Sequence, residues 1–236
     1  MRGAVDPTGA APRLTLLRWR MLRESEDWPG LIAMAAEPEL VARARLFGAS
    51  AQDQASSAGM IELAYARMMT NDLAGAAAIL DRSPADCDRC LIGRGQLAAA
   101  RGDAAAADRW FAMVLAATPT LPQAAFEWGK VKLARGDATG ALALFSQAHK
   151  LGPGWAEPLK FRGDALLVQG KPDQALRAYA QAAEHAPRWG GLRLVRGKAL
   201  AKAGRAAEAQ AQWQAAANMD LTPDERGELA RVQGAK

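Results

Sequence analysis

A glycine recurs every 34 residues through the second half of this chain, and this spacing constrains the fold more than any other feature. The four glycines are Gly102, Gly136, Gly170 and Gly204. A fixed period of about 20 to 50 residues is typical of proteins in which each repeat buries its apolar face against its neighbours. We therefore expect a stacked array of repeats, although 236 residues could also form one or two globular domains.

Five further classes of residue recur at fixed distances from these glycines. A second glycine precedes each one by seven residues, an alanine follows by five, an aromatic residue comes four later and a small residue three after that. A proline closes three of the units. In chain order the classes are Gly95, Gly129, Gly163 and Gly197; Ala107, Ala141, Ala175 and Ala209; Phe111, Phe145, Tyr179 and Trp213; Val114, Ala148, Ala182 and Ala216; and Pro119, Pro153 and Pro187.

Each class has a physical role in a pair of helices. A glycine inside a helix costs about 1 kcal/mol relative to alanine, and this cost is tolerated where a neighbouring helix leaves no room for a side chain. The glycine that ends the first helix adopts a left-handed conformation, and Asp103 and Asp137 can then cap the second helix. The alanine, aromatic and small residues form one apolar stripe on the second helix, which proline terminates.

This ordered set resembles the tetratricopeptide repeat (TPR) family. The resemblance covers 88–221 as four units, which are 88–121, 122–155, 156–189 and 190–221. A looser unit over 57–87 carries Ala64, Asn71, Ala76 and Leu80 at the matching positions. The resemblance implies an all-α fold, a right-handed superhelical solenoid of antiparallel helix pairs with about four to six units and a C-terminal capping helix.

The chain departs from the family pattern early in the first helix of three units. Arg94, Arg162 and Arg196 precede three of the mid-helix glycines, where the family favours apolar residues. The aliphatic part of an arginine can cover apolar surface while its guanidinium group reaches water. We expect these arginines to pack in this way.

The two ends of the chain differ in regularity. Thr222, Pro223 and Glu225 are strong helix-start signals, so 223–233 is predicted as the capping helix of a C-terminal segment 222–236, with Leu229 and Val232 facing inward. Residues 1–56 are less regular and are interpreted as helical, either a degenerate TPR or a remnant linker. Helices are expected over 14–23, from Asp27 to about Ala36, and over 38–47, with a flexible joint at 49–59.

Composition and charge exclude several classes of function. The excess of 30 basic over 25 acidic residues is small and spread along the chain, whereas nucleic-acid binders usually cluster basic residues with stacking aromatics. No nucleic-acid partner is predicted. No apolar run is long enough to span a bilayer, and residues 1–12 have no signal-peptide core. We expect a cytoplasmic protein, or a periplasmic one if a leader has been removed.

Cys87 and Cys90 form a Cys-x-x-Cys motif, the only motif in the sequence that suggests metal binding or redox chemistry. A structural zinc site needs four ligands and a thioredoxin-like site needs a strand before the helix, and neither requirement is met. A local disulfide and two free thiols remain as alternatives. A disulfide would indicate an oxidising compartment.

No catalytic set is predicted, and no cofactor or metal. His149 and His185 fall late in their helices, where a positive charge interacts favourably with the helix dipole. Neither has a carboxylate or serine arranged with it for catalysis. The recurring glycines serve packing rather than a phosphate-binding loop. We therefore do not expect an enzyme.

The TPR resemblance implies that the first helix of each unit lines a concave groove that binds a partner. The N-terminal half of the predicted groove is mainly apolar and its C-terminal half carries lysines, which would favour carboxylates. This pattern predicts a protein or peptide partner with an apolar stretch beside an acidic one. The candidate groove residues are Tyr65, Met69, Arg89, Gln96, Phe126, Lys130, Lys160, Asp164, Lys198 and Lys202.

The sequence favours a protein-protein interaction scaffold that binds a peptide or helical segment. Two alternatives stay open: a regulatory or sensor domain of a larger signalling or transcriptional protein, and a structural array that associates with itself. The lysines could also do no more than keep the concave face hydrated. The identity of the partner and the oligomeric state do not follow from the sequence.

Overall fold

The computed structural model describes residues 21–23, 25–35, 60–219 and 221–234, and this part of the chain contains helices and no strand. The chain divides into two compact units, Met1–Gly93 (unit 1) and Arg94–Lys236 (unit 2). The predictions for 36–59, and those for 14–20, lie outside the described residues.

Unit 1 contains short helices whose starts are capped by aspartates. Helix α2 (Trp28–Ala35) begins where Asp27 accepts a hydrogen bond from the backbone N–H of Gly30 at 2.9 Å, close to the helix predicted there. Residues 60–69 are helical, and α5 (Leu73–Leu80) follows, with Asp72 accepting from the N–H of Gly75 at 2.8 Å. Helix α6 (Asp88–Ala100) begins in unit 1.

Unit 2 consists of consecutive helices joined by short turns. The first helix of each pair is followed by its second helix after a turn that contains one of the recurring glycines. The helices after α6 are α7 (Ala104–Ala117), α8 (Pro122–Ala134), α9 (Ala138–Leu151), α10 (Ala156–Val168), α11 (Pro172–His185), α12 (Gly190–Lys202), α13 (Ala206–Ala217) and α14 (Pro223–Gly234).

Both glycine classes occupy the conformations predicted for them. The turn glycines have φ angles of +79°, +84°, +72° and +76°, in chain order, a region that L side chains rarely adopt. The mid-helix glycines lie against the aromatic residue of the same unit. A Cβ atom on Gly95 would lie 2.7 Å from Phe111, and one on Gly129 would lie 2.6 Å from Phe145. These glycines therefore allow the two helices of a pair to approach closely.

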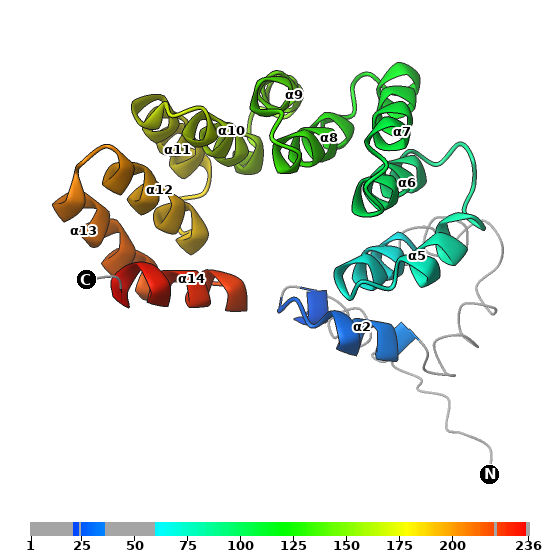
Figure 1. Cartoon of the computed structure of the whole chain (residues 1–236), viewed down its shortest axis with the longest axis horizontal. Helices are drawn as coiled ribbons and strands as arrows, with labels where there is room; N and C mark the ends of the chain where they lie inside the picture. Colours follow the sequence, from blue (N-terminus) through cyan, green and yellow to red (C-terminus); the bar gives the residue numbers. More distant parts are fainter. Residues whose placement is uncertain (1–20, 24, 36–59, 220, 235–236) are drawn as a thin grey trace, which may run out of the picture. The chain divides into compact units, whose positions relative to one another are not determined.

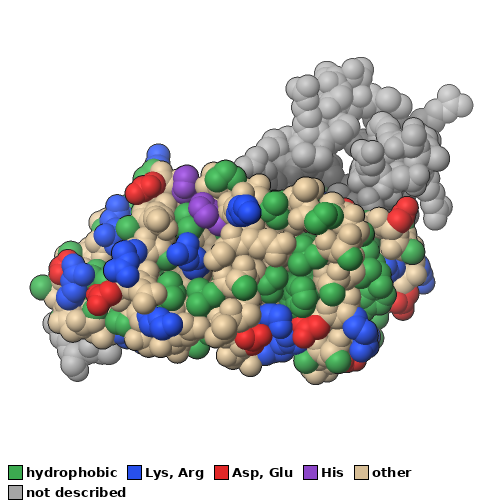
Figure 2. All heavy atoms as spheres, turned by 90° about the horizontal axis from the view of Figure 1, so that it is seen from above, with side chains coloured by type: hydrophobic (Ala, Val, Ile, Leu, Met, Phe, Trp, Pro, Cys, Tyr) green, Lys and Arg blue, Asp and Glu red, His purple; other side chains and the backbone are tan. Residues whose placement is uncertain are grey.

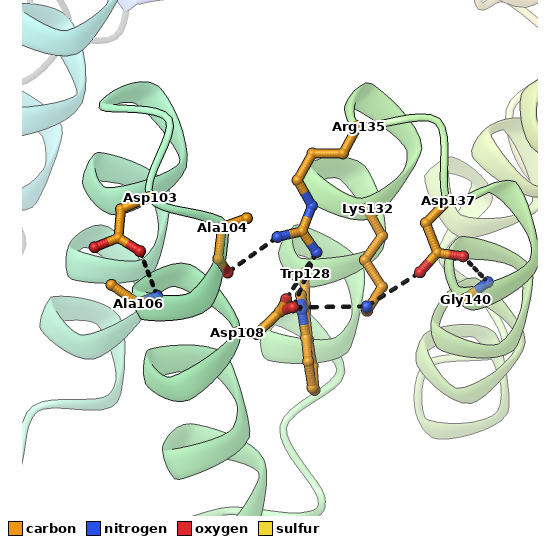
Figure 3. Close-up of polar contacts among 9 residues, drawn as sticks. All are labelled: Asp103, Ala104, Ala106, Asp108, Trp128, Lys132, Arg135, Asp137 and Gly140. Carbon is orange, nitrogen blue, oxygen red and sulfur yellow. Dashed lines mark hydrogen bonds and ion pairs between the residues drawn. The ribbon is translucent and has the colours of Figure 1, made fainter.

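The predicted apolar stripe forms the core of unit 2. Phe111, Phe145 and Tyr179 are fully buried, together with the alanines and the small residues of their units. Trp213 at the matching position is partly buried, and its indole N–H donates to the carbonyl oxygen of Leu194 at 3.2 Å. Aspartates cap two of the second helices: Asp103 accepts from the N–H of Ala106, and Asp137 from that of Gly140, both at 2.8 Å (Figure 3).

Successive helices of unit 2 pack as a curved stack. The second helices α9 and α11 each contact the first helices on both sides, and the first helices also contact one another: α8 with α10, α10 with α12, and α12 with α14. Figure 1 shows α8, α12 and α14 on the inner side of unit 2 and α7, α9 and α13 on its outer side, while α10 and α11 overlap in this view. By their contacts α10 belongs with the first helices and α11 with the second helices. We call the side formed by α8, α10, α12 and α14 the inner face.

Helix α14 ends the stack as predicted. The N–H of Thr222 donates to Glu225 Oε2 at 2.9 Å, and the N–H of Glu225 donates to Thr222 Oγ1 at 3.3 Å, which is the reciprocal pairing of a capping box. Leu229 is buried, and Val232 packs beside it against the last apolar cluster. No helix among the described residues has both the length and the apolar character that crossing a membrane requires.

Candidate functional site

Side chains of the inner face, and of α6 just before it, form contacts that join one first helix to the next. Gln96 on α6 donates a 2.9 Å hydrogen bond to Glu127 on α8, and the rings of Phe126 on α8 and Phe161 on α10 lie 5.3 Å apart. On α12, Lys198 forms an ion pair with a glutamate of α14. Each contact links two neighbouring first helices, so these side chains are the candidates for a binding surface.

An aromatic cluster supports the inner face at α8 and α10. Phe126 contacts Trp155 at a centroid distance of 4.5 Å and Phe145 at 6.0 Å, in addition to Phe161. The Phe126 side chain is only 5% exposed. It therefore offers little surface to a partner, and the more exposed Trp155 and Phe161 carry the apolar part of the face.

Three of the four predicted groove lysines are paired with carboxylates. Lys130 also lies over the ring of Phe126 at 5.5 Å, and Lys160 lies over the ring of Phe161 at 4.2 Å. The fourth lysine, Lys202, is the last residue of α12 and is exposed. The pairs are Lys130 with Glu127 at 3.1 Å, Lys160 with Asp164 at 2.8 Å, and Lys198 with Glu228.

Asp164 has a structural partner as well as its lysine. The buried hydroxyl of Tyr179 donates a 2.7 Å hydrogen bond to Asp164 Oδ1, while Oδ2 faces Lys160. Burial, with the charge and hydrogen bond of Asp164, raises the pKa of Tyr179, so this phenol stays protonated and keeps donating. The position of the Asp164 carboxylate is therefore fixed by the core of its own repeat.

The remaining predicted groove residues belong to unit 1 and the start of α6. Tyr65 is half-buried and meets Trp28 edge to face at 5.4 Å, while Met69 is 52% exposed. Arg89 is exposed on the first turn of α6. Their participation in one groove with the inner face of unit 2 stays a prediction.

Cys87 and Cys90 are joined by a disulfide at the start of α6, with their Cα atoms 5.1 Å apart. The N–H of Cys90 donates to Cys87 Sγ at 3.2 Å, and Cys90 is completely buried. The described residues include no group of three or more His, Cys, Asp or Glu side chains placed to hold a metal ion.

Sequence reasoning missed the acidic half of the inner face. Glu127 lies three residues before Lys130 on the same helix, a spacing at which an ion pair could have been inferred. Glu228 comes from the capping helix, 30 residues after Lys198, so the 34-residue repeat gave no indication of it. The inner face therefore alternates positive and negative groups.

Comparison with known proteins identifies the fold. No protein-family model and no curated protein matches the sequence. Among solved structures, the chain is similar to TTC0263, a thermophilic TPR protein of Thermus thermophilus, with a TM-score of 0.63 and 18% identity over 74% of this chain and 97% of that one. It is also similar to PilF of Pseudomonas aeruginosa, with a TM-score of 0.61 and 14% identity over 77% of this chain and 86% of that one.

A third similar structure is YrrB, described as a TPR protein with an unusual peptide-binding site. Its TM-score is 0.54 at 18% identity, covering 75% of this chain and 91% of that one. Identities this low show the fold alone. The glycine geometry, the helix pairs and these similarities agree on the TPR fold.

Proposed function

We propose that this chain, which has the TPR fold, is a protein-interaction scaffold whose inner face in unit 2 holds a peptide or helical segment of a partner. The observation that carries the proposal is the series of partly exposed lysine–carboxylate pairs on successive first helices, next to an aromatic cluster. A surface of this kind offers donors, acceptors and apolar contacts in a row. YrrB, a structure with the same fold, is described as having a peptide-binding site.

The size of the inner face suits a short segment. Neighbouring packed helices lie about 8 to 10 Å apart, so crossing from α8 to α12 takes about 20 Å. An extended peptide covers this distance in about six residues. Such a segment would place apolar side chains near Trp155 and Phe161 and acidic ones toward Lys202.

Lys202 is the group best placed to select an acidic residue. It lies four residues after Lys198, so both side chains project from the same face of α12. Lys198 is already paired with Glu228, whereas Lys202 is exposed. Among the described residues Lys202 forms no ion pair, so it can pair with a partner's carboxylate without breaking an existing contact there.

A capture experiment with matched variants tests this proposal. The natural protein, Lys202→Glu and Arg109→Glu would each be used as bait in extract of the source cell, because Arg109 is an exposed arginine on the outer helix α7 and its reversal changes the net charge equally. We expect the partner to be lost by Lys202→Glu and retained by Arg109→Glu. Equal capture by all three baits would contradict binding at the inner face.

A second measurement separates this function from self-association. Light scattering at several concentrations would report a constant monomer mass if the inner face is free for another protein. A mass that rises with concentration, and falls on Lys202→Glu, would instead indicate that copies of the chain occupy it.

A further inference from the structure

The outer side of unit 2 contains a cleft that plays no part in the binding proposed for the inner face. It has a volume of about 390 Å³ and lies between α9 and α11, with α10 as its floor. Its polar side chains are Ser146 from α9, Arg162 from α10, and Gln174, Arg177 and Gln181 from α11. We call this cleft the outer groove.

The outer groove holds two arginines that have no direct partner among the described residues. No aspartate or glutamate lines the cleft, and within the described part of the chain neither guanidinium forms a hydrogen bond or an ion pair. Arg177 is exposed, and Arg162 is half-buried. The inner lysines, by contrast, are mostly neutralised by carboxylates of the fold.

The same two helices carry a pair of histidines beyond the cleft. His149 follows Ser146 by three residues on α9, and His185 follows Gln181 by four on α11, so each continues the face that lines the outer groove. Their ring centroids are 6.4 Å apart, and Nδ1 of His149 is buried with no hydrogen-bond partner among the residues that the structure describes. Figure 2 shows the histidines adjacent to each other, with Lys and Arg side chains on the same face.

Burial and two basic neighbours act on the pKa of His149. Burial lowers the pKa of His149 below its usual value, and the positive charges of His185 and Arg162 lower it further. A bound anion would offset these charges and raise that pKa. The histidine therefore provides a sensor of anion binding beside the groove.

We propose that the outer groove is a second binding site, for an acidic peptide segment whose Asp or Glu side chains pair with Arg162 and Arg177. Guanidinium groups bind carboxylates through two parallel hydrogen bonds, and two of them in one cleft select a ligand with two carboxylates. The exposed amides of Gln174 and Gln181 can pair with the peptide backbone. The aliphatic side chains of Leu142 and Leu166 give the methylene groups of glutamate an apolar floor.

The length of the groove favours a peptide over a small anion. The lining residues of α11 run from Gln174 to Gln181, which at about 1.5 Å per residue spans roughly 10 Å. This distance corresponds to about three residues of extended chain. A single phosphate would contact only part of it.

The test uses a fluorescein-labelled hexaglutamate peptide and measures its anisotropy at low ionic strength. Arg162→Gln/Arg177→Gln removes both guanidinium groups, and Arg109→Gln/Arg226→Gln removes two exposed positive charges elsewhere in unit 2. We expect the first pair to weaken binding at least tenfold and the control pair by less than twofold. Arg177→Glu, at an exposed position, gives the same comparison with the least risk to folding.

Three results would overturn the proposal. The first is no binding by the natural protein, and the second is an equal loss in the control variant, which would indicate general electrostatic attraction. The third is displacement of the peptide by an equal concentration of tripolyphosphate, which would identify a small-anion site. Lys202→Glu leaves hexaglutamate binding intact if the outer groove is the site, so this result is independent of the inner face.

A nuclear magnetic resonance titration adds a readout of location. The chain has two histidines, so its imidazole signals are few. Hexaglutamate should shift both signals and raise the pKa of His149, and should do neither in Arg162→Gln/Arg177→Gln. Unchanged histidine signals at saturating peptide would place the peptide elsewhere.

Discussion

The indole Nε1 of Trp128, on α8, donates a 2.6 Å hydrogen bond to Oδ1 of Asp108, on α7 (Figure 3). Arg135 donates to the two oxygens of the same carboxylate at 2.8 and 3.1 Å, and to the carbonyl oxygen of Ala104 at 3.0 Å. The ammonium group of Lys132 lies 3.9 Å from Asp108. One carboxylate on the second helix of a repeat thus binds two side chains of the following helix and that of its C-cap residue.

Asp108→Ala should destabilise unit 2 by about 1 kcal/mol, because it removes these hydrogen bonds from a side chain that is 38% exposed and partly screened by water. Urea unfolding followed by circular dichroism measures the change. Glu184→Ala, at an exposed position on α11, is the control and should change stability little. Equal losses in the two variants would show that the α7–α8 network contributes nothing specific.

A double-mutant cycle isolates the Trp128–Asp108 bond within this network. Trp128→Phe keeps an aromatic ring beside Phe111, whose ring lies parallel to Trp128 with centroids 6.1 Å apart, but removes the N–H donor. The decreases in unfolding free energy of the two single variants should together exceed the decrease in the double variant by about 0.5 to 1 kcal/mol. Strict additivity would mean that the hydrogen bond is not stabilising.

The contribution of Asp108 should depend on pH. Burial would raise its pKa, but the hydrogen bonds from Trp128 and Arg135 and the charges of Lys132 and Arg135 lower it below the usual value of 3.8. A lowered pKa in the folded state means that the stabilisation is present above the unfolded pKa and is lost as pH falls through the folded one. The stability difference between natural protein and Asp108→Asn should therefore be constant near neutral pH and vanish in acid. A difference that grows in acid would contradict this sign.

The fold was predictable because the repeating residues report backbone geometry that every unit shares. A left-handed turn and a close helix approach each require glycine, so Gly136 and Gly129 recur with the same spacing as their counterparts. The capping box at Thr222 and Glu225 was predictable for a similar reason, since both partners lie within one helical turn.

The surfaces were less predictable because their partners are not periodic. Glu228 neutralises Lys198 from a helix that is not a full repeat, and Arg135 reaches back 27 residues to Asp108. The outer groove combines Ser146, Arg162 and Arg177 from three helices, and no local pattern relates them. Residue type and spacing were therefore enough to identify the fold. The ion-pair partners of the surface charges could be identified only from the structure.

The disulfide at α6 predicts the pattern of thiol labelling. Without reductant, iodoacetamide should modify neither Cys87 nor Cys90, because both are bonded. After reduction under native conditions, Cys87 should react faster, since it is partly exposed while Cys90 is completely buried. Peptide mass spectrometry locates the label at each time. Rapid modification of both cysteines before reduction would show that the thiols are free.

Two glycine-to-alanine changes should have opposite effects because their surroundings differ. A Cβ atom at Gly129 would lie 2.6 Å from the fully buried ring of Phe145, so Gly129→Ala should overpack the core and destabilise by about 1 to 3 kcal/mol. A Cβ atom at Gly227, in α14, would have no neighbour within 4 Å, so Gly227→Ala should stabilise by up to about 1 kcal/mol through helix propensity. Urea unfolding of both variants measures the two signs under one condition. Stabilisation by both would mean that the recurring mid-helix glycines are not required by close packing, and the physical basis proposed for the 34-residue pattern would fail.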